Sequence, residues 1–218
     1  MSHVRRAPFL LAACLALAAV PAPAAEVAIE GQAGYRGLAF KDTAQALLGK
    51  TGGGTFGGAL RVTVWRGLFV SAGYRTFSAD GERVFLASPG APPQKLGFPL
   101  SLKLTDIPLT IGYRLRQGKA IVPYLTAGAV ITKYAETSSV AGESFDQSVS
   151  KTGFIGGAGV ELRLVHSGLV RVAGEAGYSS VGSAIGTAGV SKVLSEDNIG
   201  GAYAVGKLVI AFSVGGRN

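Results

Sequence analysis

The sequence predicts an all-β fold, an antiparallel, up-and-down, eight-stranded transmembrane β-barrel, and three observations support this prediction. Hydrophobic residues make up 48% of the chain, yet beyond an apolar N-terminal run no stretch reaches the ~18 apolar residues of a spanning helix, whereas ~9–11 alternating residues make a spanning strand. Apolar residues alternate with small or polar residues in several segments, as in strands with two unlike faces. Short and long connections also alternate along the chain, which is typical of membrane barrels.

The N-terminal segment 1–25 predicts a signal peptide. Two arginines precede an apolar run over 7–20, and small residues at 22–24 follow it. This order is typical of an export signal, so we expect cleavage after Ala24 or Ala25. The remaining residues, 26–218, then form the outer-membrane β-barrel domain.

Four segments alternate clearly and predict strands: 27–39, 56–65, 154–164 and 170–178. In the first of them, Val27, Ile29 and Tyr35 share one face, whereas Glu30 and Arg36 share the other. Successive side chains of a strand point to opposite faces, so each of these strands has one apolar and one polar or small-residue face.

Four further strands are predicted less regularly: about 68–78, 104–115, 121–134 and 202–213. In the second of these, the apolar positions change from even, as at Leu104, to odd, as at Ile107. Pro108 also lacks a ladder donor, so we expect a β-bulge near Asp106. The faces of 121–134 stay unassigned, because both are nearly equally apolar.

The connections between these strands alternate in length. Tight turns are predicted around 66–67, 116–119 and 166–168, and long loops near 41–54, 80–99, 136–150 and 180–199. In bacterial transmembrane barrels the short turns are periplasmic and the long loops lie outside the cell. Both ends of the barrel domain are therefore expected in the periplasm.

Charge and aromatic placement favour a membrane barrel over a soluble, lipocalin-like one. The polar strand faces carry only about one to three charges each and are otherwise Gly, Ala, Ser and Thr, whereas a water-facing outer wall should be ~25–35% charged. Aromatic side chains on the apolar faces are predicted to form two girdles, Tyr35, Tyr74, Phe154 and Tyr178 near the loop end and Trp65, Tyr113 and Phe212 near the turn end. Two such girdles are typical of transmembrane barrels.

Three strings carry a family resemblance: 106–114 (DIPLTIGYR), 122–128 (VPYLTAG) and 156–163 (GGAGVELR). With them the chain resembles the small eight-stranded outer-membrane barrels of Gram-negative bacteria, the OmpA/OmpX/OmpW-like class. The resemblance implies a cell-envelope location in the outer membrane, but it transfers no ligand or catalytic residue. The chain departs from the class in having six residues after Phe212, where such barrels usually end in an aromatic residue.

In that location we expect a monomer that contacts outer-membrane lipid and lipopolysaccharide and uses the barrel assembly machinery during biogenesis. The candidate site is a network of charged side chains on the polar faces, which point into the lumen: Glu30, Arg36, Arg61, Arg75, Asp106, Arg114, Glu161, Arg163, Arg171 and Glu175. Glu26 shares this face. A lone charge in a dehydrated interior costs several kcal/mol, so nearly balanced charges predict ion pairs that plug the barrel in a structural role.

The first pairs expected in this network join Glu161 and Arg163 to Arg171 and Glu175, because a hairpin turn sets the two strands opposite each other. Two functions remain open. One is a closed barrel with a structural or surface-binding role; the alternative is a narrow porin or a channel for small or apolar solutes. The Pro-rich loop over 80–99 is interpreted as packed on the barrel rim, or as a cap, a protein contact or the entry for an apolar ligand.

Composition disfavours several other classes of protein. The net charge is +8, but the four predicted loops are acidic in sum, so we expect no nucleic-acid partner. After export His166 is the one remaining histidine, in a predicted periplasmic turn, which disfavours an enzyme, including one that transfers or hydrolyses lipid A acyl chains. One Cys and the absence of metal-ligand spacings predict no metal and no other cofactor. Glycine, at 33 of 218 residues, disfavours helical bundles.

Overall fold

The computed structural model describes residues 25–115, 119–140, 143–164, 169–182 and 184–214. All of the predicted signal peptide except Ala25 lies outside the described residues. The same holds for most of the predicted turns at 116–119 and 166–168.

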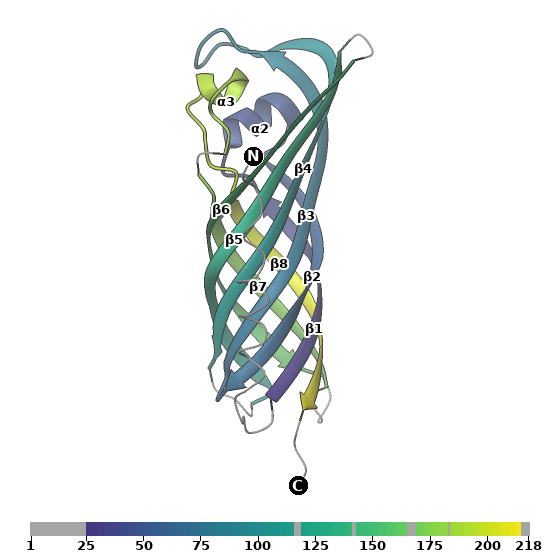
Figure 1. Cartoon of the computed structure of the whole chain (residues 1–218), viewed down its shortest axis with the longest axis vertical. Helices are drawn as coiled ribbons and strands as arrows, with labels where there is room; N and C mark the ends of the chain where they lie inside the picture. Colours follow the sequence, from purple (N-terminus) through teal and green to yellow (C-terminus); the bar gives the residue numbers. More distant parts are fainter. Residues whose placement is uncertain (1–24, 116–118, 141–142, 165–168, 183, 215–218) are drawn as a thin grey trace, which may run out of the picture.

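Eight antiparallel strands pair in chain order and close into a barrel (Figure 1). They are β1 (Ala25–Gly37), β2 (Gly52–Trp65), β3 (Leu68–Phe85), β4 (Gln94–Arg114), β5 (Ile121–Val140), β6 (Glu143–Arg163), β7 (Val170–Ser180) and β8 (Gly201–Val214). The first strand pairs with the last, for example Ile29 with Ile210, so the sheet is continuous around the ring. The predicted fold class is confirmed.

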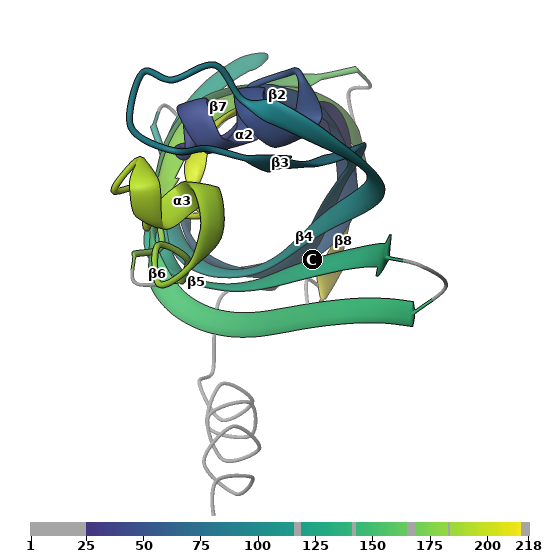
Figure 2. The ribbon, with the colours of Figure 1, turned by 90° about the horizontal axis from the view of Figure 1, so that it is seen from above.

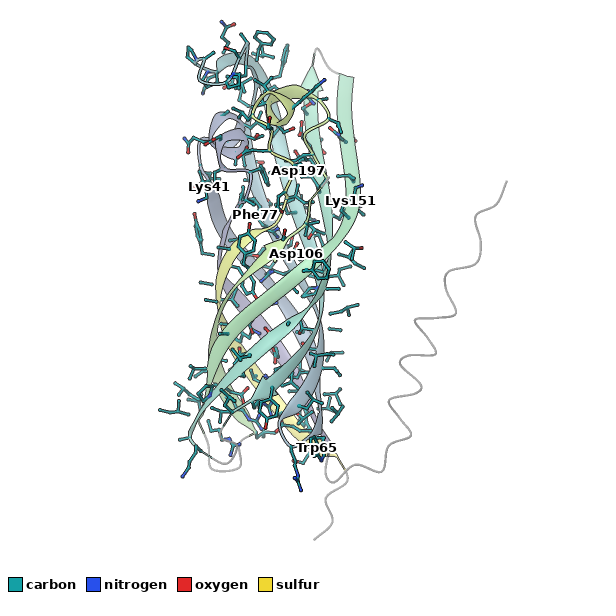
Figure 3. The ribbon with its side chains drawn as sticks, turned by 90° about the vertical axis from the view of Figure 1, so that its left-hand side faces the viewer. Lys41, Trp65, Phe77, Asp106, Lys151 and Asp197 are labelled. Atoms are coloured by element: carbon teal, nitrogen blue, oxygen red, sulfur yellow. The ribbon has the colours of Figure 1, made fainter. Side chains whose placement is uncertain are left out.

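The two faces of the strands separate as the alternation predicts. On β1, Ile29 and Tyr35 are each 53% exposed on the outer wall, whereas Glu30 and Arg36 are buried in the lumen. The aromatic residues predicted to form the two girdles are all exposed large side chains, and Figure 3 shows Trp65 at the turn end of the barrel. The outer wall is thus apolar, as contact with lipid requires.

The tight turn between β2 and β3 is confirmed. Arg66 and Gly67 have φ angles of 35° and 88°. Two consecutive residues with positive φ make the short hairpin turn whose twist matches that of the flanking strands.

Two of the four predicted long loops are largely strand, which corrects the sequence interpretation. β3 continues to Phe85 and β4 begins at Gln94, so most of 80–99 is a hairpin. Likewise β5 and β6 extend through most of 136–150. These extensions project beyond the apolar belt and are mostly polar over 136–150, whereas the β3–β4 hairpin also carries Val84, Phe85, Leu96 and Phe98. Ladder hydrogen bonds form there without the alternation on which the sequence prediction depended.

The other two loops contain short helices, which the sequence did not indicate. α2 (Lys41–Leu48) follows β1, and α3 (Gly189–Val193) lies between β7 and β8. Seen from above, both helices lie over the loop-end mouth of the barrel (Figure 2). Neither helix of the described residues is long and apolar enough to cross a membrane.

The β-bulge expected near Asp106 is absent. Asp106 pairs with Arg75 on one side and Thr132 on the other in an unshifted register, and the register of β3 and β4 shifts instead between Glu82 and Val84. The even positions Leu100, Leu102 and Leu104 are buried inside the barrel. The change from even to odd apolar positions therefore marks a lumen that turns from apolar to charged, not a break in the strand.

Candidate functional site

The turn-end half of the lumen is filled by ion pairs centred on Glu161. Its carboxylate lies 2.8 Å from Arg61 Nη2 and 2.9 Å from Arg171 Nη1, with Arg114 Nε at 3.9 Å. Arg171 and Arg114 also pair with Glu26, the latter at 2.8 Å. Glu161 is fully buried, so these guanidinium groups compensate a charge that water does not reach.

A second part of the network continues toward the middle of the barrel. Glu30 pairs with Arg61 at 3.0 Å and with Lys207 Nζ at 3.4 Å. Lys207 in turn lies 2.6 Å from Glu175 Oε2. Charges from β1, β2, β7 and β8 therefore form one connected chain across the lumen.

Two tyrosines hold Glu175 in place, and glycines make room for them. The hydroxyl groups of Tyr124 and Tyr203 donate hydrogen bonds to Glu175 at 3.0 and 3.1 Å. A Cβ at Gly159 would lie 2.4 Å from Tyr124 Cζ, and one at Gly177 would lie 2.5 Å from the Tyr203 hydroxyl. Glycine is needed at these positions because the aromatic rings cross the narrow lumen and, at Gly177, because the backbone carbonyl of Gly156 would lie 2.3 Å from the Cβ.

Asp106 is the centre of the upper ion-pair cluster. It lies 2.5 Å from Arg36 Nη1 and 3.2 Å from Arg75 Nη2, and it accepts a hydrogen bond from Thr132 Oγ1 at 2.7 Å. Arg36 also donates to the carbonyl of Ile199 at 3.0 Å. Arg75 stacks over a tyrosine ring of β8, 4.1 Å from its centroid. This cluster ties the connection after β7 to the barrel wall.

Above Asp106 the lumen becomes apolar. Figure 3 shows Phe77 next to Asp106 inside the barrel, and Phe77 is the register partner of Leu104, which lies two residues nearer the loop end than Asp106. A buried cluster fills this level: Leu38, Phe40, Ala44, Phe77, Ala79, Leu100, Leu102, Leu104, Val130, Tyr134, Ile155, Val181, Ile199, Tyr203 and Val205. Ala44 belongs to α2, so the helix closes the top of this apolar plug.

The segments that carry α2 and α3 lie over the barrel mouth, and we call them the cap. Hydrogen bonds join these two segments to each other. Glu196, which follows α3, accepts hydrogen bonds from the backbone amides of Asp42 and Thr43 at 3.2 and 2.8 Å. A carboxylate at a helix N-terminus accepts hydrogen bonds from the free backbone amides, and the positive end of the helix dipole stabilises its negative charge. The segment that carries α3 therefore supplies the N-terminal cap that α2 lacks in its own sequence.

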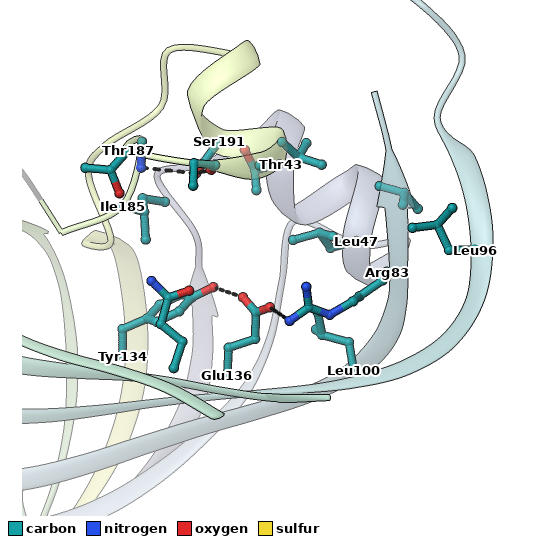
Figure 4. A pocket seen from close by; sticks show the side chains of 16 residues that line it. Thr43, Leu47, Arg83, Leu96, Leu100, Tyr134, Glu136, Ile185, Thr187 and Ser191 are labelled. Atoms are coloured by element: carbon teal, nitrogen blue, oxygen red, sulfur yellow. Dashed lines mark hydrogen bonds and ion pairs between the residues drawn. The ribbon is translucent and has the colours of Figure 1, made fainter. Parts of the chain in front are cut away.

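A cavity of about 230 Å³ lies between the cap and the strand extensions (Figure 4). Its polar part contains Arg83, whose Nη2 lies 3.3 Å from Glu136 Oε1 and whose Nε donates to Ser138 Oγ at 2.6 Å. Tyr134 donates to the other Glu136 oxygen at 2.7 Å. The buried Thr43 hydroxyl has no hydrogen-bond partner among the described residues. Apolar walls are formed by Leu47, Val84, Leu96, Leu100, Ile185 and Val190.

Glu82 fixes the tip of the β3–β4 hairpin beyond this cavity. It accepts a hydrogen bond from the Gly97 amide at 2.8 Å and pairs with Lys95 at 3.2 Å. Both contacts favour the ionised carboxylate, and together they lower the pKa of Glu82 below its ordinary value. Gly97 has a φ of 75°, which glycine adopts without strain.

The family model described as "outer membrane protein beta-barrel domain" matches residues 10–203. The chain belongs to this family. The outer-membrane barrel OprG of Pseudomonas aeruginosa is similar in structure, with 13% identity, a TM-score of 0.55 and coverage of 88% of this chain and 98% of that one. A major outer membrane protein from Thermus thermophilus has 15% identity, a TM-score of 0.53 and coverage of 87% and 99%. At such identities the likeness shows the fold alone, and no curated protein matches the chain.

Within this outer-membrane barrel, nine of the ten residues of the predicted network take part in the ion pairs described above. Glu161 and Arg171 come together as expected. Arg163 does not reach Glu175, because the register sets Arg163 opposite Arg171 and Glu175 opposite Gly159. Arg163 is half-buried near the turn end and forms no ion pair with the described residues.

Sequence reasoning missed Lys207, Tyr124 and Tyr203, which connect the two parts of the outer-membrane barrel's network. On β8 the lumen face reads Tyr203, Val205, Lys207 and Val209, so a single charge lies among apolar and aromatic residues. The spacing along the strand could have revealed Lys207, because it lies on the same face of β8 as the other odd positions, including Tyr203. Arg83 and Glu136 were missed because their strand extensions were interpreted as loops, and Tyr134 was missed because the faces of the predicted strand 121–134 stayed unassigned.

Two expectations about chemistry concern other parts of the barrel. His166, on which the argument against catalysis depended, lies outside the described residues. Among the residues that the structure does describe, no cluster of three or more His, Cys, Asp or Glu side chains could hold a metal ion.

Proposed function

We propose that this protein is a closed outer-membrane barrel whose function lies at its outer cap, where the cavity binds a small neutral ligand. One observation carries the proposal: side chains fill the lumen at two successive levels. The turn-end level holds a connected ion-pair network, and the level under α2 holds an apolar plug. Removing one partner from a buried ion pair costs about 3–5 kcal/mol. Opening a path through the lumen would break several such pairs, which supports a barrel that stays closed.

The cavity under the cap supports the binding role. In bacterial outer-membrane barrels the long-loop end faces outward, so the cavity is accessible from outside the cell. Its volume of about 230 Å³ is below the ~300–1,000 Å³ of drug-sized sites.

The chemistry of the lining narrows the ligand class. Arg83 and Glu136 neutralise each other, so neither attracts a charged ligand strongly. The Thr43 hydroxyl lacks a hydrogen-bond partner in the described part of the chain. A buried polar atom without a hydrogen bond costs about 1–3 kcal/mol, so a ligand with one hydrogen-bonding group would be favoured here. With the surrounding leucines and isoleucine, these features fit a small neutral amphiphile with a single polar head, such as a short alcohol.

Two measurements test the proposal. In planar bilayers the refolded protein should show no steady conductance, and steady single-channel currents would refute the closed lumen. For binding, the unfolding midpoint should rise in a series of linear alcohols up to the length that fills the cavity. Leu100→Trp, which fills the cavity, should abolish this rise, whereas Leu125→Trp on the lipid-facing wall should not. An equal rise in both variants would show that the alcohols act on the membrane alone.

A narrow solute channel is the second candidate, and one observation favours it. A polar cavity of about 40 Å³ lies in the lumen beside Arg61 and Arg75, and the Nε atoms of both residues have no hydrogen-bond partner within the described ranges. A polar space of this size is large enough to hold a water molecule, which is what a partly hydrated path through the lumen would require. Steady conductance that changes its ion selectivity in Arg75→Gln would favour this alternative over the closed barrel.

Membrane location is tested separately. The native protein should fractionate with the outer membrane and migrate differently on gels before and after heating, as folded barrels do. Recovery in the soluble fraction, or identical migration, would contradict the outer-membrane assignment itself.

A further inference from the structure

The outer edge of the lipid-facing belt differs around the barrel. On β3, β6 and β7 it is marked by the exposed aromatic residues Tyr74, Phe154 and Tyr178. On β4 and β5 the belt ends at Ile107 and Ile131, which are register partners and are exposed. The aromatic girdle is therefore interrupted over these two strands.

Two lysines occupy the position just beyond this interruption. Lys133 follows Ile131 by two residues on β5, and its register partner on β4 is Thr105. Lys103 lies two residues beyond Thr105 on the same strand. Both lysines are exposed on the outer wall, since the alternate positions Leu102, Leu104, Thr132 and Tyr134 are buried in the lumen.

The register brings the two ammonium groups within reach of one anion. Residues that are diagonal across an antiparallel pair lie ~7–8 Å apart on the same face, a gap that two flexible lysine side chains can close. Hydroxyl groups flank them, because Ser78 pairs with Lys103 and Ser150 pairs with Lys133. All four of these side chains are exposed.

Neither lysine forms an ion pair with a described residue, although one exposed carboxylate on this face, Asp80, lies diagonal to Lys103 as the register partner of Ser101. The described residues hold Lys95 and Lys207 in ion pairs with carboxylates, but no ion pair holds Lys103 or Lys133. Lys133 lies two residues beyond Ile131 and Lys103 four residues beyond Ile107. These are rises of ~6.6 and ~13 Å along the strands, and the rises along the membrane normal are smaller because the strands tilt. We therefore expect both ammonium groups at the level of the lipid head groups, above the acyl chains.

We propose that Lys103 and Lys133, with Ser78 and Ser150, form a binding site for the phosphate group of an anionic glycolipid in the outer leaflet, the chemistry of lipid A. The site's place at the edge of the apolar belt selects a phosphate that is attached to acyl chains over a free phosphate. The proposal is independent of the cap cavity and rests only on the membrane location of the barrel.

The test uses the full barrel domain refolded in micelles of neutral detergent and analysed by native mass spectrometry with bound lipid retained. The probes are hexa-acylated lipid A with two phosphates and the same lipid A after phosphatase treatment. Each interfacial lysine contributes about fivefold to the binding of anionic lipid. Wild-type protein should therefore bind the phosphorylated probe roughly thirtyfold more tightly than the K103Q/K133Q variant, and this preference should shrink as salt screens the charges.

A matched control removes the same charge elsewhere. K41Q/K192Q deletes two exposed lysines from the cap helices and should bind like the wild type. Equal binding by wild type and K103Q/K133Q, equal loss in the control, or equal binding of the dephosphorylated probe would each overturn the proposal. Displacement of lipid A by millimolar inorganic phosphate would also overturn it, because the site would then select free phosphate. All variants substitute exposed residues, and their heat-dependent gel migration checks that they fold.

Discussion

Replacing Glu161 by Gln should destabilise the barrel by about 3–5 kcal/mol, the cost of breaking a buried ion pair by removing one partner. Glu161 is fully buried and lies 2.8 Å from Arg61 and 2.9 Å from Arg171. At these separations each pair has a gross Coulomb energy of about 6 kcal/mol at the effective dielectric constant near 20 that describes proteins. Part of this energy offsets the desolvation of the carboxylate, so the net loss is smaller than the sum of both pairs.

The assay is equilibrium unfolding in urea of the barrel refolded into lipid vesicles, followed by tryptophan fluorescence and gel migration. Asp146→Asn is the matched control, because Asp146 lies exposed on the extension of the same strand. The control should unfold within about 0.5 kcal/mol of the wild type, as surface substitutions usually do. A loss below about 1 kcal/mol for Glu161→Gln would refute the reasoning, because it would mean that water or lipid head groups already solvate the network.

Three further predictions concern other parts of the molecule. Gly159→Ala should lower stability by about 1–3 kcal/mol through overpacking, because its Cβ would meet a tyrosine ring at 2.4 Å. A Cβ at Gly174 on the next strand would meet no described atom within 4 Å. Gly174→Ala should therefore be neutral in the same unfolding assay. Glu196→Ala removes the acceptor at the α2 N-terminus and should cost about 0.5–2 kcal/mol of cap stability, seen as faster tryptic cleavage in the cap with an unchanged barrel core; unchanged cleavage would contradict the cap contact. The pKa of Glu82 is lowered in the folded hairpin from 4.5, so the contact stabilises the tip above pH 4.5 and is lost as pH falls through the lower folded pKa. Amide exchange at Gly97, corrected for its intrinsic pH dependence, should then show less protection, and Glu82→Gln should remove this pH dependence.

The sequence predicted the lipid-facing and lumen faces well wherever the two faces have unlike partners. On β1 and β6 the lipid side is apolar and the lumen side is charged or small, so period-2 alternation reports both. The same reasoning failed where the partners change along a strand. On β4 the lumen face passes from Leu104 to Asp106. The sequence suggested a bulge there, because a periodic pattern does not show at which level of the lumen a residue lies.

The candidate site was predictable as a set of residues but not as a set of pairs. Which guanidinium meets which carboxylate depends on strand register across the closed ring. Glu161 reaches Arg61 on β2, a strand that is not its neighbour in the sheet. The cap was unpredictable for a related reason, because the α2 N-terminus is satisfied by Glu196 from a segment 153 residues away. Helix signals that depend on local capping residues are then missing from the sequence.

The ion-pair network also bears on how the barrel closes. Glu26 and Glu30 of the first strand pair with Arg171 of β7 and with Lys207 of β8. Before β1 meets β8 these carboxylates lack part of their compensation, and afterwards the charges in the lumen stabilise one another. A buried charge without its partner costs several kcal/mol, so the network favours the fully closed ring over open sheets. The effect of Glu161→Gln should therefore appear as destabilisation of the whole barrel in one transition, and separate unfolding of one hairpin before the others would contradict this coupling.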